Sequence, residues 1–108
     1  METAFVKIVV FVPVAHADGV RVALAKASAG KIGNYDSCSF SVLGTGRFRP
    51  LDGADPFIGV VGELEEAAEE RIETVCAREK LEAVLAAVRA AHPYEEPAID
   101  VYPLLNLS

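Results

Sequence analysis

The sequence predicts an α+β protein with the ferredoxin-like βαββαβ architecture, and three observations lead to this prediction. The chain has 108 residues and is 52% hydrophobic, which is enough for one compact domain with a real core. Two stretches repeat apolar residues at helical spacing, and four stretches have the composition of strands. Their order fits a sandwich in which both helices cover one face of an antiparallel sheet with strand order 4-1-3-2.

The first strand is expected from Phe5 to Val12, where β-branched and aromatic residues predominate and Pro13 closes the run. Its alternation is apolar on both faces, so we expect burial on both sides, with only Lys7 as a polar break. Helical spacing of apolar residues then predicts a helix from about Ala15 to Ser28. Gly30 is well placed to end it.

The middle of the chain contains two predicted strands separated by a long loop. Alternating side chains predict a half-exposed strand from Ser37 to Val42, which should pair with a longer strand from Ala68 to Cys76. Glycines and prolines predict an irregular loop from Gly44 to Pro56, and a loop of this length is often functional. The segment from Phe57 to Val61 is expected to form a short extra strand.

The last third gives the strongest helix signal of the chain. Apolar residues form one stripe between Arg78 and Ala91, and Pro93 closes the helix. A short final strand is expected from Ala98 to Tyr102. The remaining residues, from Pro103 to Ser108, form an apolar tail without clear periodicity.

Composition excludes several classes of partner. A formal net charge of −6 argues against binding to nucleic acid, which requires a dense positive face. The longest apolar run, Ile8 to Ala15, is too short to cross a membrane, and the N-terminal sequence lacks the features of a signal peptide, so we expect a cytoplasmic protein. Cys38 and Cys76 are expected to be buried free thiols. The five glutamates between Glu63 and Glu70 are expected to form a solvated segment.

A candidate site is centred on the turn from His92 to Pro97, which reads His-Pro-Tyr-Glu-Glu-Pro and is stiffened by two prolines. In the predicted topology this turn lies at the same end of the sheet as His16 and the loop from Gly44 to Pro56. The two histidines of the chain should therefore lie on adjacent chain ends. We predict a shared binding site there.

The residue types suggest specific roles within that site. Imidazole and carboxylate groups are candidate metal ligands at His16, His92 and Glu95, with zinc or copper as the expected ion. Arg47 and Arg49 are candidate ligands for an anion. Tyr94 and Glu96 are expected to be supporting polar groups that contact the ligand.

Simpler interpretations remain open for the same residues. The turn can serve only to end a helix, and His16 stands where a helix begins, a usual place for a polar residue. Arg47 and Arg49 can pair with the acidic segment from Glu63 to Glu70 and bind nothing.

The motifs resemble a known family. Four runs of residues and the C-terminal ending resemble the domain inserted into YqfO-type members of the Nif-three family. The runs are Gly33-Asn-Tyr-Asp, Cys38-Ser-Phe-Ser, Gly44-Thr-Gly-Arg-Phe-Arg-Pro and Asp55-Pro-Phe-Ile-Gly, and the ending is His92-Pro-Tyr-Glu-Glu-Pro-Ala-Ile-Asp-Val-Tyr-Pro. That domain is similar to the CutA and PII modules, which are ferredoxin-like and form trimers. The resemblance implies a stand-alone version of this domain, without the dinuclear metal site of the flanking domains.

The resemblance also implies binding functions. Similarity to CutA suggests a divalent metal, and similarity to PII suggests that the loop between the second and third strands handles an effector. Relative to CutA, Glu96 precedes Pro97 where an apolar residue usually stands, which alters the expected metal selectivity. The loop has no Walker-type lysine motif.

Two functions of different classes follow. The leading hypothesis is a non-enzymatic binding or regulatory module that takes a divalent metal or a small anionic ligand at the loop end of the sandwich. The alternative is a small metal-dependent hydrolase or lyase in which Glu95 or Glu96 acts as general base near His92. The chain has no Gly-x-Ser-x-Gly elbow and no phosphate loop, which weakens the alternative.

The first strand also predicts self-association. Val9 and Phe11 point away from Ile8 and Val10, so an apolar patch should remain on the face that the helices leave uncovered. Burying a residue such as Phe11 contributes about 1.5 to 3 kcal/mol, which favours a partner on that face. Because CutA-like and PII-like modules form threefold rings, we predict a homotrimer.

Overall fold

Four strands form one antiparallel sheet in the order β2-β3-β1-β4 in the computed structural model, which describes residues 4–105. The strands are β1 (Phe5–Pro13), β2 (Phe40–Phe48), β3 (Glu65–Ala77) and β4 (Ile99–Leu104). The helices are α1 (Ala17–Lys26) and α2 (Leu81–Ala91), preceded by the 3-10 turns η1 (Val14–His16) and η2 (Arg78–Lys80). The predicted α+β, ferredoxin-like fold and its strand order are confirmed.

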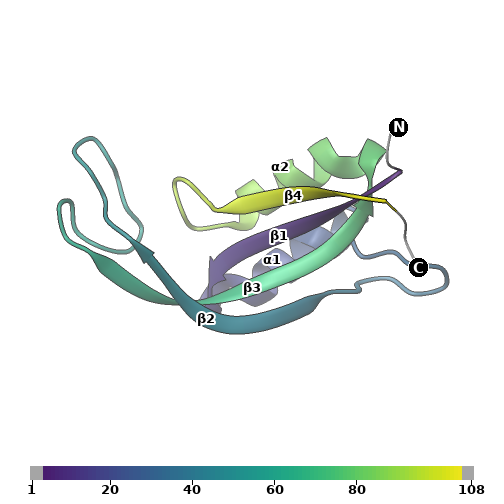
Figure 1. Cartoon of the computed structure of the whole chain (residues 1–108), viewed down its shortest axis with the longest axis horizontal. Helices are drawn as coiled ribbons and strands as arrows, with labels where there is room; N and C mark the ends of the chain where they lie inside the picture. The colour runs from purple at the N-terminus through teal and green to yellow at the C-terminus, as the bar shows by residue number, and fades with distance from the viewer. Residues whose placement is uncertain (1–3, 106–108) are drawn as a thin grey trace.

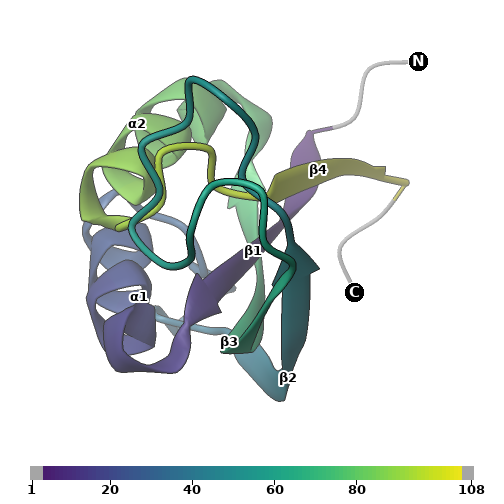
Figure 2. The same ribbon diagram turned by 90° about the vertical axis from the view of Figure 1, so that its left-hand side faces the viewer.

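Both helices lie on one face of the sheet, and no helix of residues 4–105 covers the other face (Figures 1 and 2). The core between sheet and helices is built mainly from aliphatic side chains. It contains Val6, Ile8, Val10, Val12, Ala17, Val20, Leu24, Ala29, Ile72, Cys76, Val84 and Val88. The even-numbered residues of β1 therefore share one face, as their alternation predicts, and this face is the one that the helices cover.

The predicted boundary between β2 and the following loop is wrong. The strand continues from Val42 to Phe48, and Gly44 to Phe48 pairs with the acidic start of β3. Glycines are tolerated here because β2 is an edge strand, and Glu66 fits the paired strand because its side chain is exposed. The paired ribbon extends beyond the helices, at the left of Figure 1.

The connection from β2 to β3 is consequently shifted along the chain and runs from 49 to 64. The extra strand predicted from Phe57 to Val61 does not form, because this segment consists of bends and a turn. Pro50 is buried, and the backbone N–H of Gly62 donates to its carbonyl over 2.8 Å. This contact closes the base of the loop.

The open face of the sheet differs from the prediction in where its apolar surface lies. Val9 is 0% exposed, and Phe11 is only partly exposed, with the Arg71 guanidinium 5.6 Å from the centre of its ring. Lys7 and Arg71 both pair with Glu73 across the middle of this face. The exposed apolar side chains therefore lie toward the sheet edges, at Phe40, Val42 and Tyr102.

The remaining predictions need small adjustments. Cys76 is a buried free thiol whose pKa is raised by burial, whereas Cys38 is free but only partly buried and precedes β2. β4 extends to Leu104, and the end of the predicted apolar tail, 106–108, lies outside the described residues. Among residues 4–105, no helix is long and apolar enough to span a membrane.

Candidate functional site

Three segments that are distant in sequence meet at one end of the sheet. The His16 ring contacts the Phe57 ring edge-on with 5.2 Å between centroids, and Phe57 lies 6.5 Å from the Tyr94 ring. The backbone N–H of Asp55 donates to the Glu95 carboxylate over 3.1 Å. Figure 2 shows the connection from β2 to β3 beside the turn that precedes β4. The convergence predicted from topology is therefore present.

His92 attaches the turn to the sheet. The backbone N–H of Tyr94 donates to His92 Nδ1 over 3.1 Å, so Nε2 carries the proton and donates to the Phe11 carbonyl over 2.7 Å. The side chain is buried, and burial lowers its pKa, which favours the neutral ring. Both ring nitrogens of His92 are thus occupied by hydrogen bonds within the chain.

The predicted metal ligands do not form a metal-binding group in this arrangement. Both nitrogens of His92 are engaged, and Glu95 accepts the Asp55 amide. His16 Nδ1 is buried and has no hydrogen-bond partner among the described residues, and the His16 ring packs against Phe57. Within residues 4–105, no group of three or more His, Cys, Asp or Glu side chains could hold a metal ion. The predicted donor set therefore does not fit a metal.

A cavity of about 400 Å³ opens between the β2–β3 connection and the turn, and neither His16 nor His92 lines it. Its walls are largely apolar and include aromatic rings from β1, β2, the loop and the turn. The aromatic members are Phe11, Phe48, Phe57 and Tyr94. Gly46 and Glu69 from the β2–β3 ribbon, and Glu95 and Glu96 from the turn, also line it. A cavity of this size and character is typical of small-molecule sites.

Glu69 is the residue of this site that the sequence prediction missed. It was expected in a solvated acidic segment but is only 8% exposed, and Tyr94 Oη donates to its carboxylate over 2.8 Å. A Cβ atom at Gly46 would overlap that carboxylate, so the glycine makes the space that it occupies. Burial and the Glu69 carboxylate raise the pKa of Tyr94, which keeps the phenol protonated as a donor.

A signal for Glu69 was present in the sequence, although it requires the register to be known. Gly44 and Gly46 pair with Glu69 and Ala67 in the ribbon. A strand with two glycines opposite an acidic strand leaves room for a large side chain to fold over it. Because the sequence predicted that β2 ends at Val42, the pairing of Gly44 and Gly46 with β3 was not expected.

The two predicted anion ligands have different surroundings. Arg47 Nε lies 3.4 Å from Glu66 Oε1, and both side chains are exposed, as the alternative interpretation expected. Arg49 also lines the cavity and is exposed, and no ion pair involving it occurs within residues 4–105. Of the two arginines, Arg49 has the guanidinium that remains available for a ligand.

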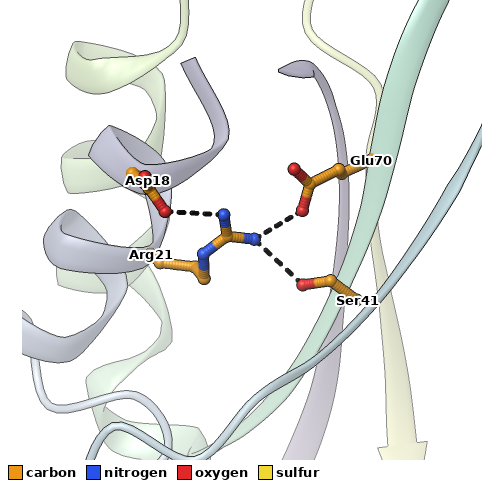
Figure 3. Close-up of polar contacts among 4 residues, drawn as sticks. All are labelled: Asp18, Arg21, Ser41 and Glu70. Atoms are coloured by element: carbon orange, nitrogen blue, oxygen red, sulfur yellow. Dashed lines mark hydrogen bonds and ion pairs between the residues drawn. The ribbon is translucent and has the colours of Figure 1, made fainter. Parts of the chain in front are cut away.

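A second polar cluster lies on the helix side of the same ribbon (Figure 3). Arg21 of α1 reaches to Glu70 of β3 over 2.6 Å, to Ser41 of β2 over 3.0 Å and to Asp18 over 2.7 Å. The bond to Glu70, followed by that to Asp18, raises the pKa of Arg21. This cluster ties α1 to the edge of the sheet, so its role is structural.

No protein-family model matches the chain. Comparison with solved structures defines the class of fold: CutA from Archaeoglobus fulgidus superposes with a TM-score of 0.69 at 19% identity, over 96% of this chain and 87% of that one. CutA1 from Shewanella sp. SIB1 gives 0.71 at 16% identity, over 100% and 88%. The chain therefore has a CutA-like fold.

More similar proteins are considerably longer. A Bacillus cereus protein related to NIF3 has a TM-score of 0.84 and 49% identity, over 98% of this chain and 27% of that one. The proteins named GTP cyclohydrolase 1 type 2 homolog from Halalkalibacterium halodurans and Bacillus subtilis are 53% and 52% identical, over 93% and 91% of this chain. The chain spans 27% and 26% of their lengths. Over nearly its whole length the chain is therefore similar to a domain within these longer Nif-three-related proteins, as the resemblance indicated.

Proposed function

We propose that this chain is a cytoplasmic, non-enzymatic binding module that takes a small ligand with an acidic group in the cavity at the loop end of the sheet. The observation that carries the proposal is the cavity of about 400 Å³, walled by aromatic rings and bordered by Arg49. Apolar walls with few polar groups suit binding of an organic body, with the polar groups setting its orientation. The free thiols Cys38 and Cys76 are compatible with a reducing compartment.

The acidic group of the ligand would meet Arg49. A guanidinium offers a planar pair of donors that matches a carboxylate or phosphate, and Arg49 has no carboxylate partner within the described part of the chain. Arg47 is less suited, because it already pairs with Glu66. The loop that carries Arg49 is the one for which the PII resemblance implies an effector role.

The two alternatives have less support from the geometry. A general base at Glu95 working with His92 would need a free imidazole nitrogen, and both nitrogens of His92 are bonded within the chain. Divalent cation tolerance is what the names of several CutA structures state, and a metal at His16, His92 and Glu95 would require the turn to rearrange. The organic ligand therefore remains the better-supported proposal.

Titration of the ¹⁵N-labelled chain with sodium benzoate tests the proposal. Benzoate should shift the amide signals of Gly46 and Tyr94, and Arg49→Ala should weaken its affinity about tenfold, the loss expected for one charge-assisted contact. Arg78→Ala, an exposed arginine at the opposite end of the sheet, is the matched control and should bind as wild type.

Other outcomes would change the proposal. Absence of shifts at the cavity amides, or equal affinity in Arg49→Ala, would reject the acidic-group site. Zinc or copper chloride forms a parallel arm of the titration. Tight metal binding that disappears in His16→Ala and His92→Ala would favour the metal site instead.

We further propose that the chain assembles as a homotrimer through its open sheet face. The exposed side chains of Phe40, Val42 and Tyr102 support a partner there, since Phe40 alone is 66% exposed. A second copy is the partner that the resemblance to CutA and PII modules implies. Light scattering at dilute concentration gives the mass, and a stable monomer would reject the proposal.

A further inference from the structure

We infer that the cavity recognises a cationic amine group, held by the buried carboxylate of Glu69 against the aromatic walls. The inference rests on the proposed binding cavity and adds a second recognition element to it. Together, Glu69 inside and Arg49 at the border define a zwitterionic ligand: an ammonium group and an acidic group joined by an apolar body. Small amino acids and amino-substituted aromatic acids belong to this class.

The first support for the inference is that the negative charge of the buried Glu69 carboxylate is not compensated by a cation within residues 4–105. Its side chain is buried, yet its one hydrogen bond within residues 4–105 comes from a neutral phenol, Tyr94. Two partly buried glutamates further along β3 do have cations: Glu70 pairs with Arg21, and Glu73 pairs with Lys7 and Arg71. A buried carboxylate without a cation carries a desolvation cost that a bound ammonium group would offset.

The second support is the space around that carboxylate. Gly46 has no side chain, and a Cβ atom there would collide with Glu69. Both residues line the cavity, so the carboxylate lies in a wall that a ligand can reach. The Tyr94 hydroxyl fixes one oxygen, which leaves the other oxygen as the acceptor for the ligand.

The third support is the aromatic lining. Phe48 and Tyr94 meet edge-on with 5.8 Å between their centroids, and Phe11 and Phe57 complete the set. The faces of such rings attract a cation, and rings grouped around a carboxylate form the usual site for an organic ammonium group. Phe11 already attracts a cation within the chain, because Arg71 lies over it at 5.6 Å.

The same lining distinguishes an organic cation from a metal ion. A metal requires several oxygen, nitrogen or sulfur ligands around one point, and no group of three His, Cys, Asp or Glu side chains is so arranged in the described part of the chain. One buried carboxylate with aromatic neighbours instead satisfies an ammonium group, which needs an acceptor and a surface of low polarity around its carbons.

Four matched probes test the inference: 4-(aminomethyl)benzoate, which carries both charges, benzylamine, benzoate and benzyl alcohol. Each is titrated into the ¹⁵N-labelled wild-type chain, and the amides of Gly46 and Tyr94 are followed. We expect the zwitterion to bind most tightly and benzylamine to bind at the same amides. Glu69→Gln should weaken benzylamine and the zwitterion about tenfold or more, and should leave benzoate unweakened.

A second variant guards against a folding artefact. Gly46→Ala keeps the Glu69 charge but displaces the carboxylate, so it should also reduce amine binding. Glu66→Gln, an exposed carboxylate on the same strand, is the control and should bind benzylamine as wild type does. Thermal melting of each variant confirms that it is folded at the titration temperature.

The outcomes separate the inference from the proposed function. Benzoate binding without benzylamine binding, or benzylamine binding that survives Glu69→Gln, would overturn the amine site and leave the acidic-group site standing. Benzylamine binding that depends on Glu69 without any benzoate binding would support the amine site and reject the proposed role of Arg49. Failure of every probe to shift the cavity amides would overturn both.

Discussion

Glu69 and Glu70 are adjacent in β3 but lie in two regions with opposite electrostatics. Glu70 faces α1, where the Arg21 guanidinium pairs with it over 2.6 Å and also binds Ser41 (Figure 3). Glu69 faces the cavity, where a neutral phenol is its one hydrogen-bond donor in the described part of the chain. The alternation of a strand places them on different faces, so their surroundings are independent of each other.

The difference distinguishes a structural carboxylate from a candidate binding carboxylate. Glu70 is compensated within the fold, and its pair with Arg21 holds α1 against the edge of the sheet. Glu69 is more deeply buried but has no ion pair within residues 4–105, which is the pattern expected where a ligand supplies the missing charge. Removing the compensation in one region should therefore reduce stability, whereas removing the charge in the other should not.

The largest expected change in stability comes from removing the guanidinium that compensates the charge of Glu70. Arg21→Met keeps the aliphatic stem of the side chain and removes the guanidinium, leaving Glu70, whose side chain is 19% exposed, without a cation. We expect the free energy of unfolding to fall by about 1 to 2 kcal/mol, the lower range for hydrogen bonds to charged groups because the pair is partly solvated. Urea denaturation monitored by circular dichroism measures the change.

Asp18→Ala is the matched control for that variant. Asp18 contacts the same guanidinium over 2.7 Å, but its side chain is 95% exposed. Exposed pairs of this kind contribute at most about 0.5 kcal/mol, so the control should be close to wild type. Equal losses in the two variants would contradict the view that Glu70 is the important partner of Arg21.

The core and the order of its elements were predictable because they depend on periodicity. Apolar alternation in β1 and the apolar stripe of α2 each reflect burial against one surface, and such patterns are local in the sequence. The convergence of His16, the β2–β3 connection and the His92 turn then follows from topology alone. These features needed no knowledge of individual contacts.

The chemistry at that end was not predictable in the same way. The extension of β2 through Gly44 and Gly46 depends on pairing with β3, which overrides the turn preference of glycine. The roles of His92 and Glu69 depend on which nitrogen or oxygen meets which neighbour, at Phe11 and Tyr94. Residue types marked the end of the molecule where the cavity lies, but they did not distinguish an imidazole bonded within the fold from a metal ligand.

A smaller change in the free energy of unfolding is expected when the pH is lowered, and it arises from His92, which attaches the turn beside the cavity to the sheet. Burial lowers the pKa of His92 below its ordinary value of about 6.5, so the unfolded chain binds the proton more readily than the folded one. The stability that the neutral ring contributes is therefore present above about pH 6.5 and is lost as the pH falls below it. Urea denaturation at pH 7.5 and pH 5.5 measures this loss.

His92→Gln supplies the comparison for the pH series. Glutamine does not titrate, so the decrease in stability between the two pH values should become smaller than in wild type. Glu73 does not confuse the result, since pairing with Lys7 lowers its pKa from an ordinary value that already lies below this window. An unchanged pH dependence in His92→Gln would show that the buried imidazole is not its source.

The smallest change in stability is expected for Glu69→Gln, and its sign is the informative quantity. Glutamine keeps a carbonyl oxygen that can accept the Tyr94 hydroxyl and removes a buried charge that has no cation within residues 4–105. We expect the free energy of unfolding to stay the same or to rise by up to about 1 kcal/mol.

Glu70→Gln makes the identical chemical change at the next residue, where it weakens the Arg21 pair, and should lower stability by about 1 kcal/mol. Denaturation of both variants in the same buffer decides the point: a loss at Glu69 as large as that at Glu70 would mean that the fold already compensates this carboxylate, and the contrast between the two regions would disappear.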